Sequence, residues 1–353
     1  MELSKKDSKM LQGLSVLAMV WLHLFNREAG DLFTPLLFIG PKPLSFLIAQ
    51  LADFCVFGFA FVSGYGHMAQ TGEKGWYRSR LKGLLSVLIS YWSVLAVFTV
   101  VSVIAGNAAS MPGDVWTFLK HVLTTDSSYN GAWWYMFAYA VIVLASPLIL
   151  KAVEKWHPLL LIPAGGALYI AAYAVRFWIP NGGNWFLIKF GPLGMTAAEY
   201  VIGAFFFKYR LFSKTYAVWE KINRYLRAVI GAALIAVLLI CRTYVVPALF
   251  FAPVSGIALI TLFHFWKKPN WIEKAFAFVG SHSTNVWLTH LFFCQFLFKN
   301  FVYLAKYPLL IYLFLIGITL GISMILQFIE APLQKLIKRK GTYEKNPHLL
   351  PRA

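Results

Sequence analysis

The sequence predicts an all-α, polytopic integral membrane protein with about ten transmembrane helices. Of its 353 residues, 59% are hydrophobic and only 13% are charged, and the mean hydropathy of +0.65 is far above that of soluble globular domains. The apolar residues gather into runs of about 20, the length of helix that crosses about 30 Å of hydrocarbon. Lysine and arginine lie mainly between these runs. Together these observations exclude a soluble fold.

The apolar runs divide the chain into successive expected spans. We expect them at residues 11–29, 44–69, 83–105, 132–150, 158–178, 186–207, 226–242, 246–266, 276–298 and 307–331. They form one membrane domain over residues 11–332, with an N-terminal tail at 1–10 and a basic C-terminal tail at 333–353. The connections at 106–131 and 208–225 carry too few apolar residues to fold alone. We expect the first span to be retained, because no small-residue cleavage site follows it.

Basic residues orient these spans, because lysine and arginine concentrate on the cytoplasmic side of a membrane protein. With a cytoplasmic N-terminus, 24 of the 32 basic residues fall in cytoplasmic segments and 8 fall outside or at the outer ends of spans. Both termini are therefore expected in the cytoplasm. Topology and attraction to anionic membrane lipid explain the net charge of +18, so nucleic acid is not an expected partner.

The three cysteines are Cys55, Cys241 and Cys294, and all lie within or beside apolar runs. They form no CxxC pair and have no metal-ligand spacing. We interpret them as small apolar side chains of the core, and no metal site is predicted.

A few ionisable side chains fall inside the expected spans, where they are costly unless paired or hydrated and therefore indicate function. At a rise of about 1.5 Å per residue, His23 and His290 reach a similar depth in the outer half of the membrane. Asp53 is expected near the midplane and Glu199 nearer the cytoplasm, with Glu330 at the cytoplasmic end of the last span. We hypothesise that Asp53 pairs with His23 or His290. The alternative for each histidine is hydrogen bonding between helices as part of the packing.

The short cytoplasmic stretch EKGWYRSRLKGLL carries Arg78, Arg80 and Lys82 into the third span. Positive-inside topology alone is one explanation for these residues. The other is binding of a phosphate-bearing donor at the mouth of the helical bundle, a task that suits arginine.

The outer stretch SSYNGAWWYMFAY begins the fourth span with Asn130, Trp133 and Trp134. Paired tryptophans are typical of the aromatic belt at a membrane interface. They equally suit a sugar-binding mouth, because a pyranose face stacks on an aromatic ring.

Taken in order, these stretches resemble the acyltransferase family 3 membrane enzymes, which O-acylate bacterial surface polysaccharides and related acceptors. The matching segments are KMLQGLSVLAMVWLHLF, FVSGYG, RSRLKGLL, NGAWWYMFAY, AAEYVIGAFFFKYRLF, GSHSTNVWLTHLFF and IEAPLQKLI, which together extend over about residues 8–338. The resemblance implies a bacterial plasma-membrane enzyme. Its expected reaction moves an acyl group, most simply acetyl, from cytoplasmic acetyl-CoA to a hydroxyl of an exported or lipid-linked cell-surface glycan.

The resemblance also implies roles for particular residues. His23 would be the general base on the acceptor hydroxyl, or a nucleophile that forms an acyl-imidazole, with Asp53 or His290 orienting it. The expected donor-binding residues are Arg78, Arg80 and Lys82. The expected acceptor-binding residues are Asn130, Trp133, Trp134 and Glu199.

The first span departs from the family pattern at one position. Family members carry a basic residue eleven positions before the histidine, where this chain has Gln12, so the basic partner is either missing or replaced by Lys9 one turn earlier. Some relatives also append an extracellular hydrolase-like domain. Without one, we expect either that the membrane unit acts alone or that a separate extracellular partner completes the transfer.

The residues alone leave two other classes open. A transporter or flippase for a glycan or lipid intermediate would use the same buried polar residues and aromatic mouth. A lipid-binding or sensory membrane protein would use them without chemistry. Consumption of a thioester coupled to labelling of an acceptor separates the enzyme from both.

Overall fold

The computed structural model describes residues 1–27, 32–245 and 249–339. This part of the chain is nearly all helical, and its strands form one short antiparallel hairpin in which Phe38 pairs with Pro43. The predicted all-α fold class is confirmed.

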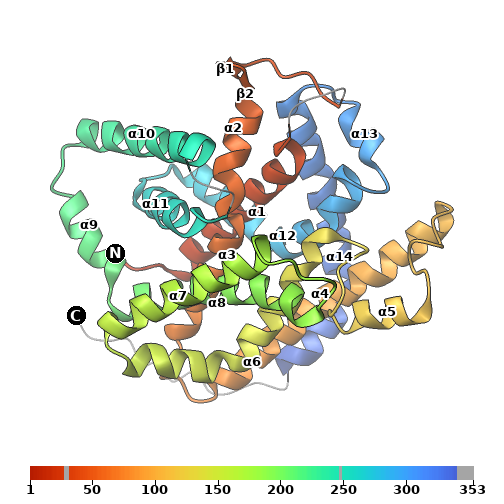
Figure 1. The fold of residues 1–353 in the computed structure, drawn as a ribbon, viewed down its shortest axis with the longest axis horizontal. Helices are drawn as coiled ribbons and strands as arrows, with labels where there is room; N and C mark the ends of the chain where they lie inside the picture. Colours follow the sequence, from red (N-terminus) through yellow and green to blue (C-terminus); the bar gives the residue numbers. More distant parts are fainter. Residues whose placement is uncertain (28–31, 246–248, 340–353) are drawn as a thin grey trace.

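The elements follow one another along the chain as drawn in Figure 1. They are α1 (Lys5–Phe25), β1 (Phe38–Ile39), β2 (Lys42–Pro43), α2 (Leu44–Leu51), η1 (Ala52–Phe54), α3 (Cys55–Met68), α4 (Trp76–Ile104), α5 (Val115–Val122), η2 (Gly131–Trp133), α6 (Trp134–Lys155), α7 (Pro158–Phe177), α8 (Trp185–Lys208), α9 (Leu211–Trp219), α10 (Arg224–Ile240), η3 (Cys241–Val245), α11 (Ala252–Phe265), α12 (Asn270–Cys294), α13 (Lys299–Tyr303) and α14 (Pro308–Arg339).

Eight helices of the described ranges are long and apolar enough to cross a membrane, which confirms a polytopic membrane protein. They are α1, α2 with α3, α4, α6, α7, α8, α10 and α14. The two other expected spans coincide with α11, which has 14 residues, and α12, which has 25. The expected first span ends, and the expected eighth begins, outside the described residues. The count of ten and the cytoplasmic termini therefore stay predictions.

Two helices extend further than the hydropathy suggests. Helix α4 begins at Trp76, so Arg78, Arg80 and Lys82 lie on its first turns and not in a loop. Helix α14 continues to Arg339, so the expected C-terminal tail is helical over 333–339, and residues 340–353 lie outside the described part. Both extensions are physically simple, because lysine and arginine are good helix formers and continue a helix into the polar layer.

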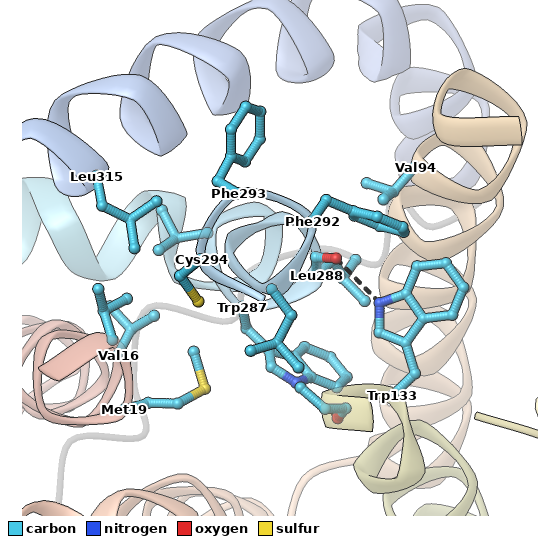
Figure 2. Packing of buried hydrophobic residues seen from close by; sticks show 14 of the residues in the cluster. Val16, Met19, Val94, Trp133, Trp287, Leu288, Phe292, Phe293, Cys294 and Leu315 are labelled. Carbon is cyan, nitrogen blue, oxygen red and sulfur yellow. Dashed lines mark hydrogen bonds between the residues drawn. The ribbon is translucent and has the colours of Figure 1, made fainter. Parts of the chain in front are cut away.

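Helix α12 forms the centre of the largest apolar core. It packs against α1, α4 and α14, and Figure 2 shows its side chains projecting in several directions around its axis. The core residues drawn there on α12 are Trp287, Leu288, Phe292, Phe293 and Cys294, and they meet Val16 and Met19 of α1, Val94 of α4 and Leu315 of α14. A helix covered on several sides tolerates polar residues that find partners in its neighbours, and α12 carries two buried histidines.

Two glycines set the close crossing of α1 and α12. A Cβ atom on Gly13 would collide with the carbonyl oxygen of Phe276, and one on Gly280 would collide with that of Lys9. Ten residues beyond each glycine lies a histidine, His23 on α1 and His290 on α12. Because both helices rise by about 15 Å over ten residues, the crossing brings the two imidazoles to the same level.

Cys55 and Cys294 are buried free thiols, and Cys241 is partly exposed at the end of α10. The first two confirm the interpretation as apolar core residues. Cys241 lies at the edge of the helical packing.

Candidate functional site

A cavity of about 930 Å³ runs into the helical bundle, a volume suited to a small-molecule ligand. Its wall is built from α1, α3, α4, α6, α12 and α14, with Arg176 of α7 and Asp53 of η1. On α1 the lining extends from Lys9 to His23, which at about 1.5 Å per residue covers about 21 Å along that helix. The cavity therefore connects the N-terminal end of α1 with the level of His23.

The two histidines form a directed hydrogen-bond chain. His290 Nδ1 lies 2.7 Å from the carbonyl oxygen of Trp287 and 3.2 Å from that of Val286, and His290 Nε2 lies 2.8 Å from His23 Nδ1. A carbonyl only accepts, so Nδ1 of a neutral His290 carries the proton and its Nε2 accepts one from His23 Nδ1. This assignment from the hydrogen-bond network leaves the lone pair of His23 on Nε2.

The environments of the two rings differ in a way that fits different roles. His290 is fully buried, whereas His23 is partly exposed and lines the cavity. His23 is thus the imidazole that a ligand in the cavity can touch. By accepting the hydrogen bond from His23 Nδ1, His290 fixes the orientation and the tautomer of the His23 ring. A group bonded to the far nitrogen of a histidine commonly has this effect in enzyme active sites.

The predicted pairing of Asp53 with a histidine is wrong. Its Oδ2 accepts hydrogen bonds from Arg242 Nε at 2.7 Å and from the backbone N–H of Leu249 at 3.2 Å. Arg242 reaches it from the π-helical turn η3 that follows α10. The signal that the sequence offered was an arginine at the end of an apolar span, which needs a carboxylate partner. Asp53 still lines the cavity beside this ion pair.

Replacing either partner of this ion pair by alanine is expected to destabilise the protein by about 3–5 kcal/mol, because the other charge is left buried and unpaired. Thermal unfolding in detergent measures the loss. The double replacement Asp53→Asn with Arg242→Gln serves as the control and should cost less than either single alanine variant. Equal losses in all three would contradict a buried charge pair.

The acceptor-binding residues predicted from the fourth span separate into two groups. Trp134 lines the cavity, and the Arg176 guanidinium lies 4.9 Å from its ring. Asn130 and Trp133 lie instead within the packing of the described chain, where both donate to the carbonyl oxygen of Leu288, at 3.1 and 3.0 Å. They fix the start of α6 against α12 and do not form a mouth.

Glu199, the remaining acceptor-binding prediction, is a buried residue of α8. Its Oε2 has no hydrogen-bond partner among the residues that the structure describes. Glu199 does not line the cavity, because the described lining contains Arg176 of α7 but no residue of α8.

Of the three basic residues predicted for a phosphate, only Arg80 is part of the described cavity wall. Its guanidinium is hydrogen-bonded to Gln70, while its Nε is buried without a partner within the described ranges. Arg78 is exposed and Lys82 is partly exposed on the outside of α4. The sequence did not reveal that Lys335 of α14 lines the cavity with Arg80.

The departure at Gln12 has a structural counterpart. Gln12 lines the cavity and accepts a hydrogen bond from Lys9 Nζ at 2.9 Å. Lys9 thereby brings a positive charge beside Gln12 on the cavity wall. Its role as a replacement for a basic residue at position 12 stays a prediction.

Comparison with known proteins gives one match. A family model described as an acyltransferase domain matches residues 7–328, which is most of the chain. No curated protein and no solved structure matches it.

Proposed function

The chain belongs to acyltransferase family 3, and from that premise we propose that it moves an acyl group, most simply acetyl, from acyl-CoA to a hydroxyl of an exported or lipid-linked cell-surface glycan. The observation that carries the proposal is the cavity, which joins a basic end at Arg80 to the lone pair of His23. A phosphate-bearing thioester and a proton acceptor for a hydroxyl are the two requirements of the reaction.

In the proposed reaction His23 Nε2 takes the proton of the acceptor hydroxyl, and the oxygen of that hydroxyl attacks the carbonyl carbon of the thioester. The C–S bond breaks, and the proton passes to the leaving thiolate to give CoA and the ester. His290 accepts the hydrogen bond from His23 Nδ1 throughout and keeps the lone pair at Nε2. The same lone pair would serve if His23 attacked the thioester first and formed an acyl-imidazole.

The two ends of the cavity suit the two substrates. Lys9, Arg80 and Lys335 carry positive charge at one end, and we assign the donor phosphates to them on the cytoplasmic side. Trp134 with the stacked Arg176 lies on the α6–α7 side, and we assign the sugar to it because a pyranose face packs on an aromatic ring. The transfer point at His23 then lies between donor and acceptor.

Inverted membrane vesicles test the proposal directly. Vesicles that contain the protein and its native glycan are given acetyl-CoA labelled in the acetyl group, and free CoA and labelled glycan are followed. We expect both to rise together. No use of thioester by the wild-type protein with its native glycan present would favour a transporter or flippase and overturn the proposal.

Replacing Arg80 by alanine is expected to raise the apparent KM for acyl-CoA about 10- to 100-fold, with a smaller effect on kcat, because a charge-assisted bond to phosphate is lost. Steady-state kinetics at varied acyl-CoA measure this split. Arg78→Ala is the matched control, since Arg78 is an exposed arginine two residues earlier on α4. A loss confined to kcat, or an equal effect in both variants, would remove Arg80 from phosphate binding.

A further inference from the structure

The cavity wall also holds a buried carboxyl group that the proposed reaction does not use. Glu330 of α14 is only 3% exposed, and its Oε2 accepts a hydrogen bond from Ser90 Oγ of α4 at 2.6 Å. Its Oε1 has no hydrogen-bond partner, and no cation forms an ion pair with it, anywhere in the described ranges. Glu330 lines the cavity.

A neighbouring side chain carries a second buried oxygen without a partner in the described ranges. Asn285 of α12 is 2% exposed, and its side chain shares a hydrogen bond with the Glu330 carboxyl, while its Oδ1 lacks a partner among the described residues. Asn285 and Ser90 both line the cavity with Glu330. Three helices, α4, α12 and α14, thus contribute to one polar patch, defined here as Ser90, Asn285 and Glu330.

The unpaired atoms of this patch determine what kind of group fits it. An oxygen buried without a hydrogen bond is costly, so a ligand that supplies N–H or O–H donors gains from binding there. The patch therefore calls for two donors on one segment of ligand. The requirement at Arg80 is the opposite, because its unpartnered Nε–H calls for an acceptor such as a phosphate oxygen.

The position of the patch along the cavity gives the order of the groups. Ser90 lies ten residues beyond Arg80 on α4, about 15 Å along the helix, and Asn285 lies five residues before His290 on α12, about 7.5 Å. A ligand that extends from Arg80 to the histidines therefore passes the patch. Such a ligand would present hydrogen-bond acceptors at Arg80, hydrogen-bond donors at the patch and its reactive group at the histidines.

We propose, on the basis of the acyl-CoA donor in the proposed function, that Glu330 and Asn285 bind the amide N–H groups of its pantetheine arm. The arm carries two amides between the phosphates and the thioester, which is the order that the cavity requires. The patch then distinguishes a pantetheine thioester from a simple thioester. Glu330 and Asn285 act by holding the arm so that the thioester reaches His23.

Three acetyl donors test this assignment: acetyl-CoA, acetyl-pantetheine, which lacks the phosphates at the adenosine end, and S-acetyl-mercaptoethanol, which lacks the amides as well. For Glu330→Gln and Asn285→Ala we expect kcat/KM to fall about tenfold or more with the first two donors and to stay unchanged with the third. Arg80→Ala should affect acetyl-CoA alone. Ser90→Ala, which removes the bond between α4 and α14, should change all three donors alike.

The outcomes separate this inference from the function on which it rests. Equal losses with all three donors in Glu330→Gln and Asn285→Ala, or no loss at all, would overturn pantetheine binding while leaving the acyltransferase intact. If these two variants raised only the KM for the glycan, the patch would bind the acceptor, and pantetheine binding would also be overturned. If the wild-type protein uses none of the three donors, the proposed function fails, and the assignment fails with it.

Discussion

His23→Ala is expected to lower the rate of acyl transfer by about 10²- to 10⁴-fold, the range that general acid–base catalysis supplies. Alanine removes the lone pair at Nε2 that lines the cavity, while the apolar face of α1 and its crossing with α12 stay intact. The protein should therefore reach the membrane in normal amounts. The measurement is the release of CoA together with labelling of glycan in vesicles that contain equal amounts of each variant.

The matched control for this variant is His282→Ala. His282 is a second buried histidine of α12, but its Nδ1 lies 2.9 Å from Ser323 Oγ, and it is absent from the described cavity lining. We expect this variant to keep its activity per folded molecule. Full activity in His23→Ala, or an equal loss in both variants, would remove His23 from the mechanism.

The vesicle assay without acceptor distinguishes the two routes open to His23. If His23 is a nucleophile, label from acetyl-CoA should accumulate on the protein, and His23→Ala should abolish this label. If His23 is a general base, no label should remain on the protein, and CoA should be released only when glycan is present.

Local patterns predicted the helices and the common level of two buried histidines. The apolar runs placed the helices in the right order, although several, such as α4, begin or end one to two turns away from the expected bounds. The rise per residue placed His23 and His290 at one level. The contact between the two imidazoles could not be predicted in this way. It depends on the close approach of α1 and α12 at Gly13 and Gly280, which is known only once the two helices are packed together. A glycine within an apolar run indicates such a crossing only once its partner helix is known.

The incorrect residue assignments have a common cause, which is that a residue type does not reveal its partner. Asp53 was matched to a histidine by depth, but Arg242 lies 189 positions away in the sequence and occupies the bond. Trp133 was grouped with Trp134 as a sugar platform. Consecutive residues of a helix point in different directions, so Trp134 lines the cavity while Trp133 donates to the carbonyl of Leu288.

The crossing of α1 and α12 leads to the second large prediction. Gly280→Ala is expected to destabilise the protein by about 3 kcal/mol or more, the upper end of the usual cost of overpacking, because the new methyl group meets the carbonyl oxygen of Lys9 and backbone cannot move aside as a side chain can. To relieve the collision, α1 must move away from α12. Thermal unfolding in detergent should show a clear fall in the midpoint temperature.

Gly317→Ala is the matched control, because Gly317 lies on α14 with no described atom within 4 Å of the position that a Cβ would take. There the same substitution should be neutral or slightly stabilising, since alanine favours helix over glycine by about 1 kcal/mol. The folded fraction of Gly280→Ala should also have a lower kcat than Gly317→Ala, because the crossing sets the 2.8 Å contact between His23 and His290. If the two variants matched in both midpoint and kcat, the glycine crossing would not be what positions the histidines, and the spacing would have to come from the larger apolar core around α12.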